Sequence, residues 1–398
     1  MPHFNRLQDC VVTNKNVIVR VDINVPIIDG KIADDTRIKA VIPTLKYLVE
    51  NQAKVIVISH FGRPKGEVKP KMSINQLVAR VQELLGSAKV SFIDDCIGEK
   101  VEKAVENTHY GEVIMLENLR FYKEETENDP EFSQKIARLG NLYVNDAFSC
   151  SHRSHASITG IPAILKSCAG FLMESELDGL GNNLENAQKP MMAVVGGAKV
   201  STKLDLIKNL AGKAQNIVVG GGMANTFLYA LGKNIGKSLC EKELKETALA
   251  IIENAKKNNC RILLPEDVVV THKLENNAKC KIVSSDNVGD DDIIVDIGPI
   301  SIANLTHELQ NHKTLVWNGP LGAFEFKPFN IGTESFARVA AGLTHSKKLI
   351  SVSGGGDVVS ALNSSGLIEE FTYISTAGGA FLEWLEGKEL PGITAISK

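Results

Sequence analysis

Basic and polar side chains follow the predicted strands of the N-terminal half, and their types suit the binding of a small anion. They are Arg20, Asp22, Asn24, Arg37, His60, Arg63, Arg120, His152, Arg153 and His155. Guanidinium groups bind carboxylate and phosphate oxygens in bidentate geometry. Each residue alone could be a surface ion pair or a structural histidine, but the carboxyl ends of parallel strands meet at one edge of a sheet. We therefore expect these side chains to converge on one crevice that binds a small, multiply anionic ligand.

Glycines and lysines take the corresponding places in the C-terminal half. The stretches are Gly196-Gly197-Ala-Lys199-Val-Ser-Thr-Lys203, Gly220-Gly221-Gly222, Asn318-Gly-Pro320 with Glu325, and Gly354-Gly355-Gly356-Asp357. Backbone N–H groups at a glycine-rich turn into a helix bind phosphate. Lys199 and Lys203 are four residues apart, so we expect both on one face of the helix that Gly196-Gly197 opens. This half predicts a nucleotide site.

The turn at 353–359 lacks the lysine and hydroxyl residue of a Walker A loop, because Asp357 and Val358 follow its glycines. Glycine-rich turns of this kind also occur for tight packing alone. Asp357 could cap the helix that starts there, or hold Mg²⁺ through one carboxylate beside a polyphosphate. The two roles are compatible.

Other motifs fail on inspection. The run at 220–225 has Asn225 where a dinucleotide fingerprint needs a glycine, and the stretch 232–238 is one residue short of a P-loop. Cys150, His152 and His155 could suggest zinc, but no fourth ligand lies nearby, so a base or anion-binding role for His152 is favoured. No G-x-S-x-G sequence indicates a hydrolase.

Apolar runs alternate with helical periodicity, which is typical of parallel sheets covered on both faces. Helical patterns occupy 37–51 and 74–86, the latter ending at Gly86, and a charged amphipathic segment at 171–190 separates the two halves. The strand-like runs are 17–23, 55–60, 113–118, 143–148, 191–197, 217–222, 261–270, 314–319 and 348–356. We predict two doubly wound α/β domains joined by a helix.

Composition excludes several function classes. The 398 residues are 43% hydrophobic and 23% charged with a net charge of −3, and no apolar run reaches the roughly 18 residues of a membrane helix. We therefore expect neither membrane nor nucleic-acid binding. Seven cysteines without paired spacing suggest reduced thiols and a cytoplasmic protein.

Eight motifs in order resemble the phosphoglycerate kinase family along the whole chain. They are RVDINVP (20–26), SHFGRP (59–64), LENLRF (116–121), HRSHAS (152–157), GGAKVSTK (196–203), VWNGPLGAFE (316–325), SGGGD (353–357) and GGAFLEWLEGKELPG (378–392). The resemblance implies two Rossmann-like domains joined by a long helix. The N-terminal domain would span 1–170, the connecting helix 171–187 and the nucleotide domain 188–379, with the tail at 380–398 packing on the N-terminal domain.

The family's activity implies reversible phosphoryl transfer between 1,3-bisphosphoglycerate and MgADP, giving 3-phosphoglycerate and MgATP, in a monomeric glycolytic enzyme. The implied substrate residues are Asp22, Asn24, Arg37, His60, Arg63, Arg120, His152 and Arg153. The implied catalytic residues are Arg37, Lys199 and Lys203, and Asp357 would ligate Mg²⁺. Nucleotide contacts would come from Gly197, Lys199, Lys203, Gly220, Gly221, Asn318, Pro320, Glu325, Gly354, Gly355, Gly356, Asp357 and Val358. No catalytic base is required, and transfer would need the domains to close about the connecting helix.

Two positions depart from the family pattern. Val358 stands where relatives carry a hydroxyl residue, and Ala377 replaces a glycine. One rival interpretation is a non-catalytic paralogue that binds nucleotide and serves as a partner or regulatory protein, although Arg37, Lys199, Lys203 and Asp357 are all present. A nicotinamide-dependent dehydrogenase of similar architecture is a second rival.

Overall fold

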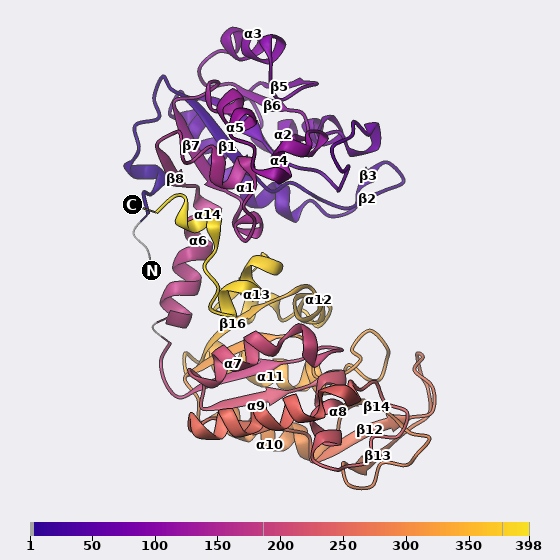
Figure 1. Cartoon of the computed structure of the whole chain (residues 1–398). Helices are drawn as coiled ribbons and strands as arrows, with labels where there is room; N and C mark the ends of the chain where they lie inside the picture. Colours follow the sequence, from indigo (N-terminus) through magenta and orange to yellow (C-terminus); the bar gives the residue numbers. More distant parts are fainter. Residues whose placement is uncertain (1–3, 186, 376, 398) are drawn as a thin grey trace. The chain divides into compact units, whose positions relative to one another are not determined.

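The computed structural model describes residues 4–185, 187–375 and 377–397. The chain divides into two compact units (Figure 1). Unit 1 comprises Met1–Asp178 and Glu389–Lys398, and unit 2 comprises Gly179–Lys388. Each unit is built around its own six-stranded sheet.

The sheet of unit 1 has the strand order β5-β6-β4-β1-β7-β8, and all of its strands are parallel. The strands are β1 (Asn16–Val21), β4 (Lys54–Ile58), β5 (Val90–Ile93), β6 (Val113–Leu116), β7 (Leu142–Asp146) and β8 (Ser167–Ala169). Their β-branched runs suit strands buried on both faces. The chain order reverses between β1 and β7, and such a reversal opens a crevice at the carboxyl ends of the two strands.

Helices cover this sheet. Alternate strand residues, such as Val17, Val19 and Val55, form one core with the buried stripes of α1 (Thr36–Glu50) and α2 (Asn75–Leu85). The remaining helices of the first 170 residues are α3 (Glu99–Asn107), α4 (Lys123–Glu127) and α5 (Pro130–Ala137), and β2 (Ile27–Ile28) pairs with β3 (Lys31–Ile32). Gly86 ends α2 with a φ of 70°, as its predicted role at the C-terminus of this helix requires.

The parallel sheet of unit 2 has the order β11-β10-β9-β15-β16-β17. Its strands are β9 (Met191–Val195), β10 (Asn216–Val219), β11 (Arg261–Leu263), β15 (Thr314–Asn318), β16 (Ile350–Gly354) and β17 (Tyr373–Ser375). Counted along the chain within this sheet, the order is 3-2-1-4-5-6, that of a Rossmann fold. The switch point lies between β9 and β15, whose carboxyl ends carry the Gly196 and Pro320 stretches.

Helices also cover the sheet of unit 2. Trp317 of β15 packs in one core with Phe336 and Val358, which belong to α11 (Ile331–His345) and α12 (Gly356–Ser364). The other helices are α7 (Leu204–Ala211), α8 (Gly221–Ala230), α9 (Lys245–Lys257), α10 (Pro299–Leu309) and α13 (Gly379–Leu385). A separate antiparallel sheet has the order β13-β12-β14 and contains β12 (Asp267–Thr271), β13 (Cys280–Ser284) and β14 (Ile293–Ile297).

One predicted strand is wrong. The run 261–270 was expected to form a single strand, but it contributes β11 to the parallel sheet and β12 to the antiparallel one. Pro265 lies in the break, and proline cannot donate a ladder hydrogen bond. The two doubly wound domains of the predicted fold are confirmed.

The chain leaves unit 1 through a helical segment. This segment contains α6 (Phe171–Leu180) and a π-helical turn at Gly181–Glu185, and Asn186 of the predicted connecting helix lies outside the described residues. The last helix among the described residues, α14 (Pro391–Thr394), belongs to unit 1, whereas α13 belongs to unit 2. Among the residues described, no helix is both long and apolar enough to cross a membrane.

Candidate active site

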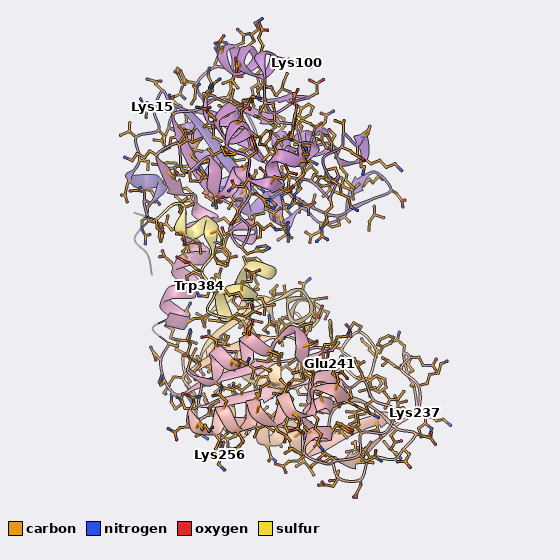
Figure 2. All side chains as sticks on the ribbon, in the orientation of Figure 1. Lys15, Lys100, Lys237, Glu241, Lys256 and Trp384 are labelled. Carbon is orange, nitrogen blue, oxygen red and sulfur yellow. The ribbon has the colours of Figure 1, made fainter. Side chains whose placement is uncertain are left out.

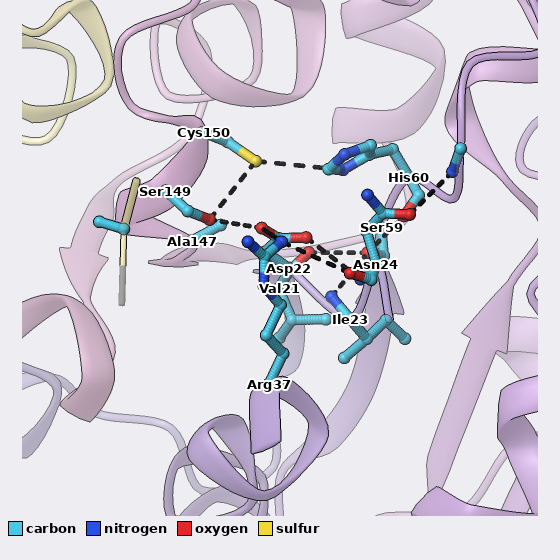
Figure 3. Close-up of polar contacts among 12 residues, drawn as sticks. Val21, Asp22, Ile23, Asn24, Arg37, Ser59, His60, Ala147, Ser149 and Cys150 are labelled. Carbon is cyan, nitrogen blue, oxygen red and sulfur yellow. Dashed lines mark hydrogen bonds and ion pairs between the residues drawn. The ribbon is translucent and has the colours of Figure 1, made fainter. Parts of the chain in front are cut away.

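The switch point of unit 1 brings Asp22, Arg37 and Ser149 together (Figure 3). Asp22 follows β1, and its Oδ2 accepts hydrogen bonds from Arg37 Nη1 at 2.7 Å and from Ser149 Oγ. Arg37 lies in the first turn of α1 with 40% of its side chain exposed, whereas Asp22 is buried. The carboxylate thus aims a guanidinium group that solvent and ligands can reach.

His60 lies at the centre of a group of arginines. It follows β4 and is buried, and its Nδ1 is 3.2 Å from Arg20 Nη2. Burial lowers its pKa well below the usual value, and the charges of Arg20, Arg120, Arg153 and Arg37 lower it further. His60 is therefore neutral at physiological pH, and four cations gather where the sequence predicted an anion site.

Two groups near this cluster have hydrogen-bonding capacity left. Arg120 Nη1 donates to Gly62 O at 2.9 Å, while its Nη2 is buried and has no partner among the residues described. Burial lowers the pKa of Arg120 to about 10, with the charges of Arg153 and Arg20 adding to the effect. His152 accepts from Arg153 Nε through Nε2, and its buried Nδ1 has no partner within the described part of the chain. A bound anion would accept a hydrogen bond from Arg120 Nη2 and would reduce the repulsion among the arginines.

The remaining predicted residues of unit 1 take different places. Asn24 Oδ1 accepts a hydrogen bond from Gly62 N at 2.9 Å and so fixes the loop that contains Gly62. Arg63, the next residue, is exposed. Arg20 is fully buried, and its Nε donates to Ser157 Oγ at 2.9 Å. His155 faces the buried Glu125 at 3.6 Å. The expectation that all five arginines and three histidines line one crevice is therefore wrong for Arg20 and His155, which support the site from behind.

Asp22, His60 and Cys150 bring possible metal ligands within 4.8 Å of one another. This set differs from Cys150, His152 and His155, the group considered from sequence. Arg20 Nη2 lies 3.2 Å from His60 Nδ1 and 3.7 Å from Cys150 Sγ, so a guanidinium group already fills the ligand-facing space. The surrounding arginines repel a metal cation, and the cluster fits an anion site instead.

In unit 2 a cavity of about 250 Å³ opens at the switch point. Five predicted nucleotide residues line it: Gly197, Gly221, Pro320, Glu325 and Asp357. Gly221 has a φ of 65°, and a Cβ there would lie 2.9 Å from Gly197 O, so only glycine fits. Gly220 instead packs against Leu321 and does not line the cavity. The rest of the lining is mostly apolar, which suits the planar base of a nucleotide.

Lys203 is held beside this cavity by three acceptors. Its Nζ donates to Gly196 O at 2.6 Å, to Asn318 O at 3.2 Å and to Asn318 Oδ1. Asn318 Nδ2 donates in turn to Gly354 O at 2.7 Å, which ties β15 to β16. Burial lowers the pKa of Lys203 to about 8, and the charge of Asp357 opposes this shift. The lysine is thus fixed close to the predicted metal ligand.

Lys199 and Lys203 do not share a helix face, so that prediction is wrong. Lys199 is exposed and extended, with φ −135° and ψ 131°, and precedes a 3₁₀ turn at Val200–Thr202. Lys203 lies between this turn and α7. The hydrogen bonds of Lys203 to two strand ends override the helical spacing.

The turn at 354–358 serves both packing and binding. A Cβ on Gly354 would lie 2.6 Å from the ring of Phe381, so this glycine allows close packing. Gly355 has a φ of 107° and precedes α12, whose first N–H groups have no partner within the helix. Asp357 is exposed at the cavity rim, whereas the side chain of Val358 is fully buried in the core. Val358 can therefore offer a ligand only its backbone N–H.

Sequence reasoning missed part of the cavity wall. Ile294 and its neighbours in β14, together with Leu239 and Leu274, supply apolar lining that no motif contains. The β-branched run Ile293-Ile294-Val295 is the signal that could have revealed β14. Ser149, which bonds Asp22, carries no comparable signal because single serines are common in turns.

Comparisons with known proteins agree with this geometry. The phosphoglycerate kinase family model matches residues 7–388. The chain is 50% identical over 397 residues to the phosphoglycerate kinase of Methylorubrum populi, covering 100% of this chain and 99% of the relative. The phosphoglycerate kinase of Agrobacterium fabrum is 49% identical over 398 residues, with coverage of 100% and 99%.

Solved structures are similar as well. The phosphoglycerate kinase of Coxiella burnetii superposes with a TM-score of 0.90 at 39% identity, covering 99% of both chains. The phosphoglycerate kinase of Pyrococcus horikoshii superposes with a TM-score of 0.79 at 32% identity, covering 98% of both chains. Matches of this length and identity, with the arginine cluster and the glycine-lined cavity in place, show that the chain belongs to the phosphoglycerate kinase family.

Proposed function

We propose that this protein transfers a phosphoryl group reversibly between 1,3-bisphosphoglycerate and MgADP, yielding 3-phosphoglycerate and MgATP. The observation that carries the proposal is the group formed by Arg37, Arg120 and Arg153 near His60, in which Arg120 Nη2 has no partner among the described residues. It provides the binding energy for a small molecule with a carboxylate and a phosphate. The second support is the cavity beside Lys203 and Asp357 in unit 2.

The proposed mechanism needs charge stabilisation and no general base. In the direction of ATP consumption, a carboxylate oxygen of 3-phosphoglycerate attacks the γ-phosphorus, and the bond to the bridging oxygen of ADP breaks. The nucleophile is already ionised, so no proton has to move. Arg37, aimed by Asp22, would stabilise the transferred group, with Lys199 and Lys203 beside it. Asn24, Arg63, Arg120, His152 and Arg153 would hold the phosphoglycerate.

The residues of unit 2 fit a magnesium nucleotide. Asp357 presents one exposed carboxylate at the cavity rim, which is the single-carboxylate mode by which proteins hold Mg²⁺ on nucleotide phosphates. When bound, the ion would neutralise charge on the β- and γ-phosphates. Pro320 and Gly221 would border the base, Glu325 would bind the ribose, and the N–H groups that begin α12 would face phosphate.

Domain closure is part of the proposal. The groups that would bind phosphoglycerate belong to unit 1 and those that would bind nucleotide to unit 2. Transfer requires the reacting atoms within about 3.5 Å of each other, so we infer that the units approach during turnover. X-ray scattering would show a smaller radius of gyration with both ligands than with either alone; equal radii in all states would contradict closure.

We also propose a cytoplasmic monomer. No disulfide joins any of the seven cysteines, all of which lie within the described residues, and this suits a reducing compartment. Light scattering of the purified protein tests the oligomeric state, and a mass near twice 43.1 kDa would contradict a monomer.

A coupled assay tests the activity. Folded protein supplied with ATP, Mg²⁺ and 3-phosphoglycerate should form 1,3-bisphosphoglycerate. An added dehydrogenase then reduces this product, and the reduction is what the assay measures. Absence of turnover by protein of confirmed fold would favour the non-catalytic interpretation. Thermal stabilisation by NAD and not by ATP would favour a dehydrogenase.

A further inference from the structure

The loop that carries Lys199 has little regular structure of its own. Lys199 is extended and exposed, and the 3₁₀ turn that follows it is three residues long. A lysine side chain has four rotatable carbon–carbon bonds and keeps most of its freedom in solvent. The place where its ammonium group can act therefore depends on how the loop backbone is held.

Glu241 holds this loop with a bidentate contact. Its Oε2 accepts from Ser201 N at 3.0 Å and its Oε1 from Ser201 Oγ at 2.5 Å. Partial burial by itself raises the pKa of Glu241. Hydrogen bonds from Ser201 and from the backbone of Val200, together with the charge of Lys199, outweigh burial, so the pKa lies below its usual value. The carboxylate is thus ionised at neutral pH, and hydrogen bonds to a charged group are the stronger kind.

Glu241 is itself fixed to a rigid element. Its backbone N donates to Oγ1 of Thr226 at 3.1 Å, and Thr226 is buried within α8. The same helix holds the other side of the lysine loop, because Met223 N donates to Gly197 O at 3.0 Å. The loop is therefore braced against α8 both before and after Lys199. Figure 2 labels Glu241 in unit 2.

We propose that Glu241 is a positioning residue for phosphoryl transfer, which acts by holding the Ser201 backbone so that Lys199 reaches the transferred group. The proposal rests on the proposed function. Base and ribose contacts come from the cavity, and Lys203 is held separately by Gly196 and Asn318. Loss of Glu241 should therefore disturb transfer more than nucleotide binding.

The test compares Glu241→Ala with Glu243→Ala and with Lys199→Ala. Glu243 is an exposed carboxylate two residues away, so its replacement removes the same charge without releasing Ser201. We expect Glu241→Ala to lower kcat about tenfold, within the range caused by small misplacements of a reacting group. KM values for ATP and 3-phosphoglycerate should stay within about twofold, and Glu243→Ala should match the wild type.

The double variant Lys199→Ala/Glu241→Ala separates positioning from general damage. If Glu241 acts through Lys199, the double variant should be as slow as Lys199→Ala alone. The inference would be overturned if the loss of kcat in the double variant were the product of the two single losses. It would also be overturned if Glu241→Ala and Glu243→Ala had equal kcat. Either result would leave the proposed function intact. A wild type without any turnover would overturn both.

Ser201→Ala gives a second measurement should Glu241→Ala fold poorly. It removes the hydroxyl hydrogen bond and keeps the one from Ser201 N. We expect a smaller loss of kcat, again absent in the Lys199→Ala background, together with faster hydrogen exchange at residues 200–203. Unchanged kcat and unchanged exchange would contradict the positioning role.

Discussion

At the scale of a single residue, the proposed role of Lys203 should make nucleotide binding depend on pH. Burial lowers its pKa to about 8, so its charge is present below that pH and is lost above it. We expect the affinity for MgADP to fall as the pH rises from 7 to 9.5, by up to about tenfold per pH unit beyond the pKa. Calorimetric titration at several pH values measures this.

Lys203→Arg is the matched control, because arginine stays charged throughout this pH range. The variant should bind MgADP more weakly than the wild type. A planar guanidinium group cannot donate to the same three acceptors as the ammonium group of Lys203. Its affinity should nevertheless be flat with pH. The same pH dependence in both proteins would assign the titration to another group.

Arg37 should matter for transfer and little for the nucleotide. It belongs to unit 1 and pairs with Asp22, whereas the nucleotide cavity is lined by unit 2. We expect Arg37→Ala to lower kcat at least a hundredfold, on the scale of one lost oxyanion donor, with the Kd for MgADP within about twofold. Equal losses of kcat and nucleotide affinity would contradict its assigned place.

Val358 should affect stability without improving nucleotide binding. Its side chain is fully buried in the core with Trp317 and Phe336. We expect Val358→Thr to lower the free energy of unfolding by about 1–3 kcal/mol, because a hydroxyl group is buried. The Kd for MgADP should change less than twofold, as in the control Val358→Ala, which shortens the side chain without adding a hydroxyl group. A tenfold gain in affinity would show that this side chain does reach the ligand.

Residue types at strand ends were predictable from the sequence, but their partners were not. Arg37 and Asp22 lie far enough apart in sequence that only the folded switch point joins them. Arg20 looked like a ligand residue, yet burial and Ser157 turn it into a support for His60. Spacing put Lys199 and Lys203 on one helix, and tertiary hydrogen bonds to Gly196 and Asn318 decided otherwise.

At the scale of elements, Asp146 holds the start of α6. It ends β7 and is fully buried, and its Oδ1 accepts from Met173 N at 3.1 Å. Burial raises its pKa to about 6, which outweighs the hydrogen bonds to its ionised form. The helix by which the chain leaves unit 1 thus begins at a carboxyl group that titrates near neutral pH.

Asp146→Asn should therefore change how stability depends on pH. In the unfolded chain the pKa is near 3.9, so folding takes up a proton between pH 4 and pH 6, and the wild type loses stability as the pH rises through this window. We expect the variant to be more stable at pH 8, by up to roughly 3 kcal/mol, and similar at pH 4. Urea unfolding at both pH values measures this, and a difference independent of pH would contradict the raised pKa.

Elements with long β-branched runs or clear helical periods were predictable, and short or interrupted ones were not. The first strand and the helix after it match their predicted ranges within about one or two residues. β8 and β17 have three residues each, too few for a period of two to emerge. The break at Pro265 sends β12 into another sheet, and only its antiparallel pairing with β13 and β14 reveals this.

At the scale of the whole molecule, the two ligands should protect different units. MgADP should slow hydrogen exchange at residues 196–222 and 319–325, and 3-phosphoglycerate at 20–24, 59–63 and 118–120, because these segments carry the proposed contacts. With both ligands present, protection should exceed the sum of the separate effects if the units close. Protection of the same peptides by each ligand alone would contradict the division of roles.

Alternation of strands and helices was enough to predict two doubly wound domains. The strand orders were not predictable, because chain order does not determine which strands pair. The orders matter for the site, since the switch points between β1 and β7 and between β9 and β15 are where the polar clusters lie. The sequence therefore indicated which residue types form the two clusters. The strand order explains why each cluster lies at a switch point.

The arginines around His60 repel one another when no anion lies between them. Four cations share a partly buried space, and the pKa of Arg120 falls to about 10 because burial and like charges disfavour its protonated form. An anion bound there would add to the negative charge that Asp22 already supplies to Arg37. Unit 1 should then be least stable in a buffer of low ionic strength without multivalent anions, and sulfate or phosphate at millimolar concentration should raise its melting temperature. The proposed substrate would thus bring the charge of unit 1 closer to balance when it binds.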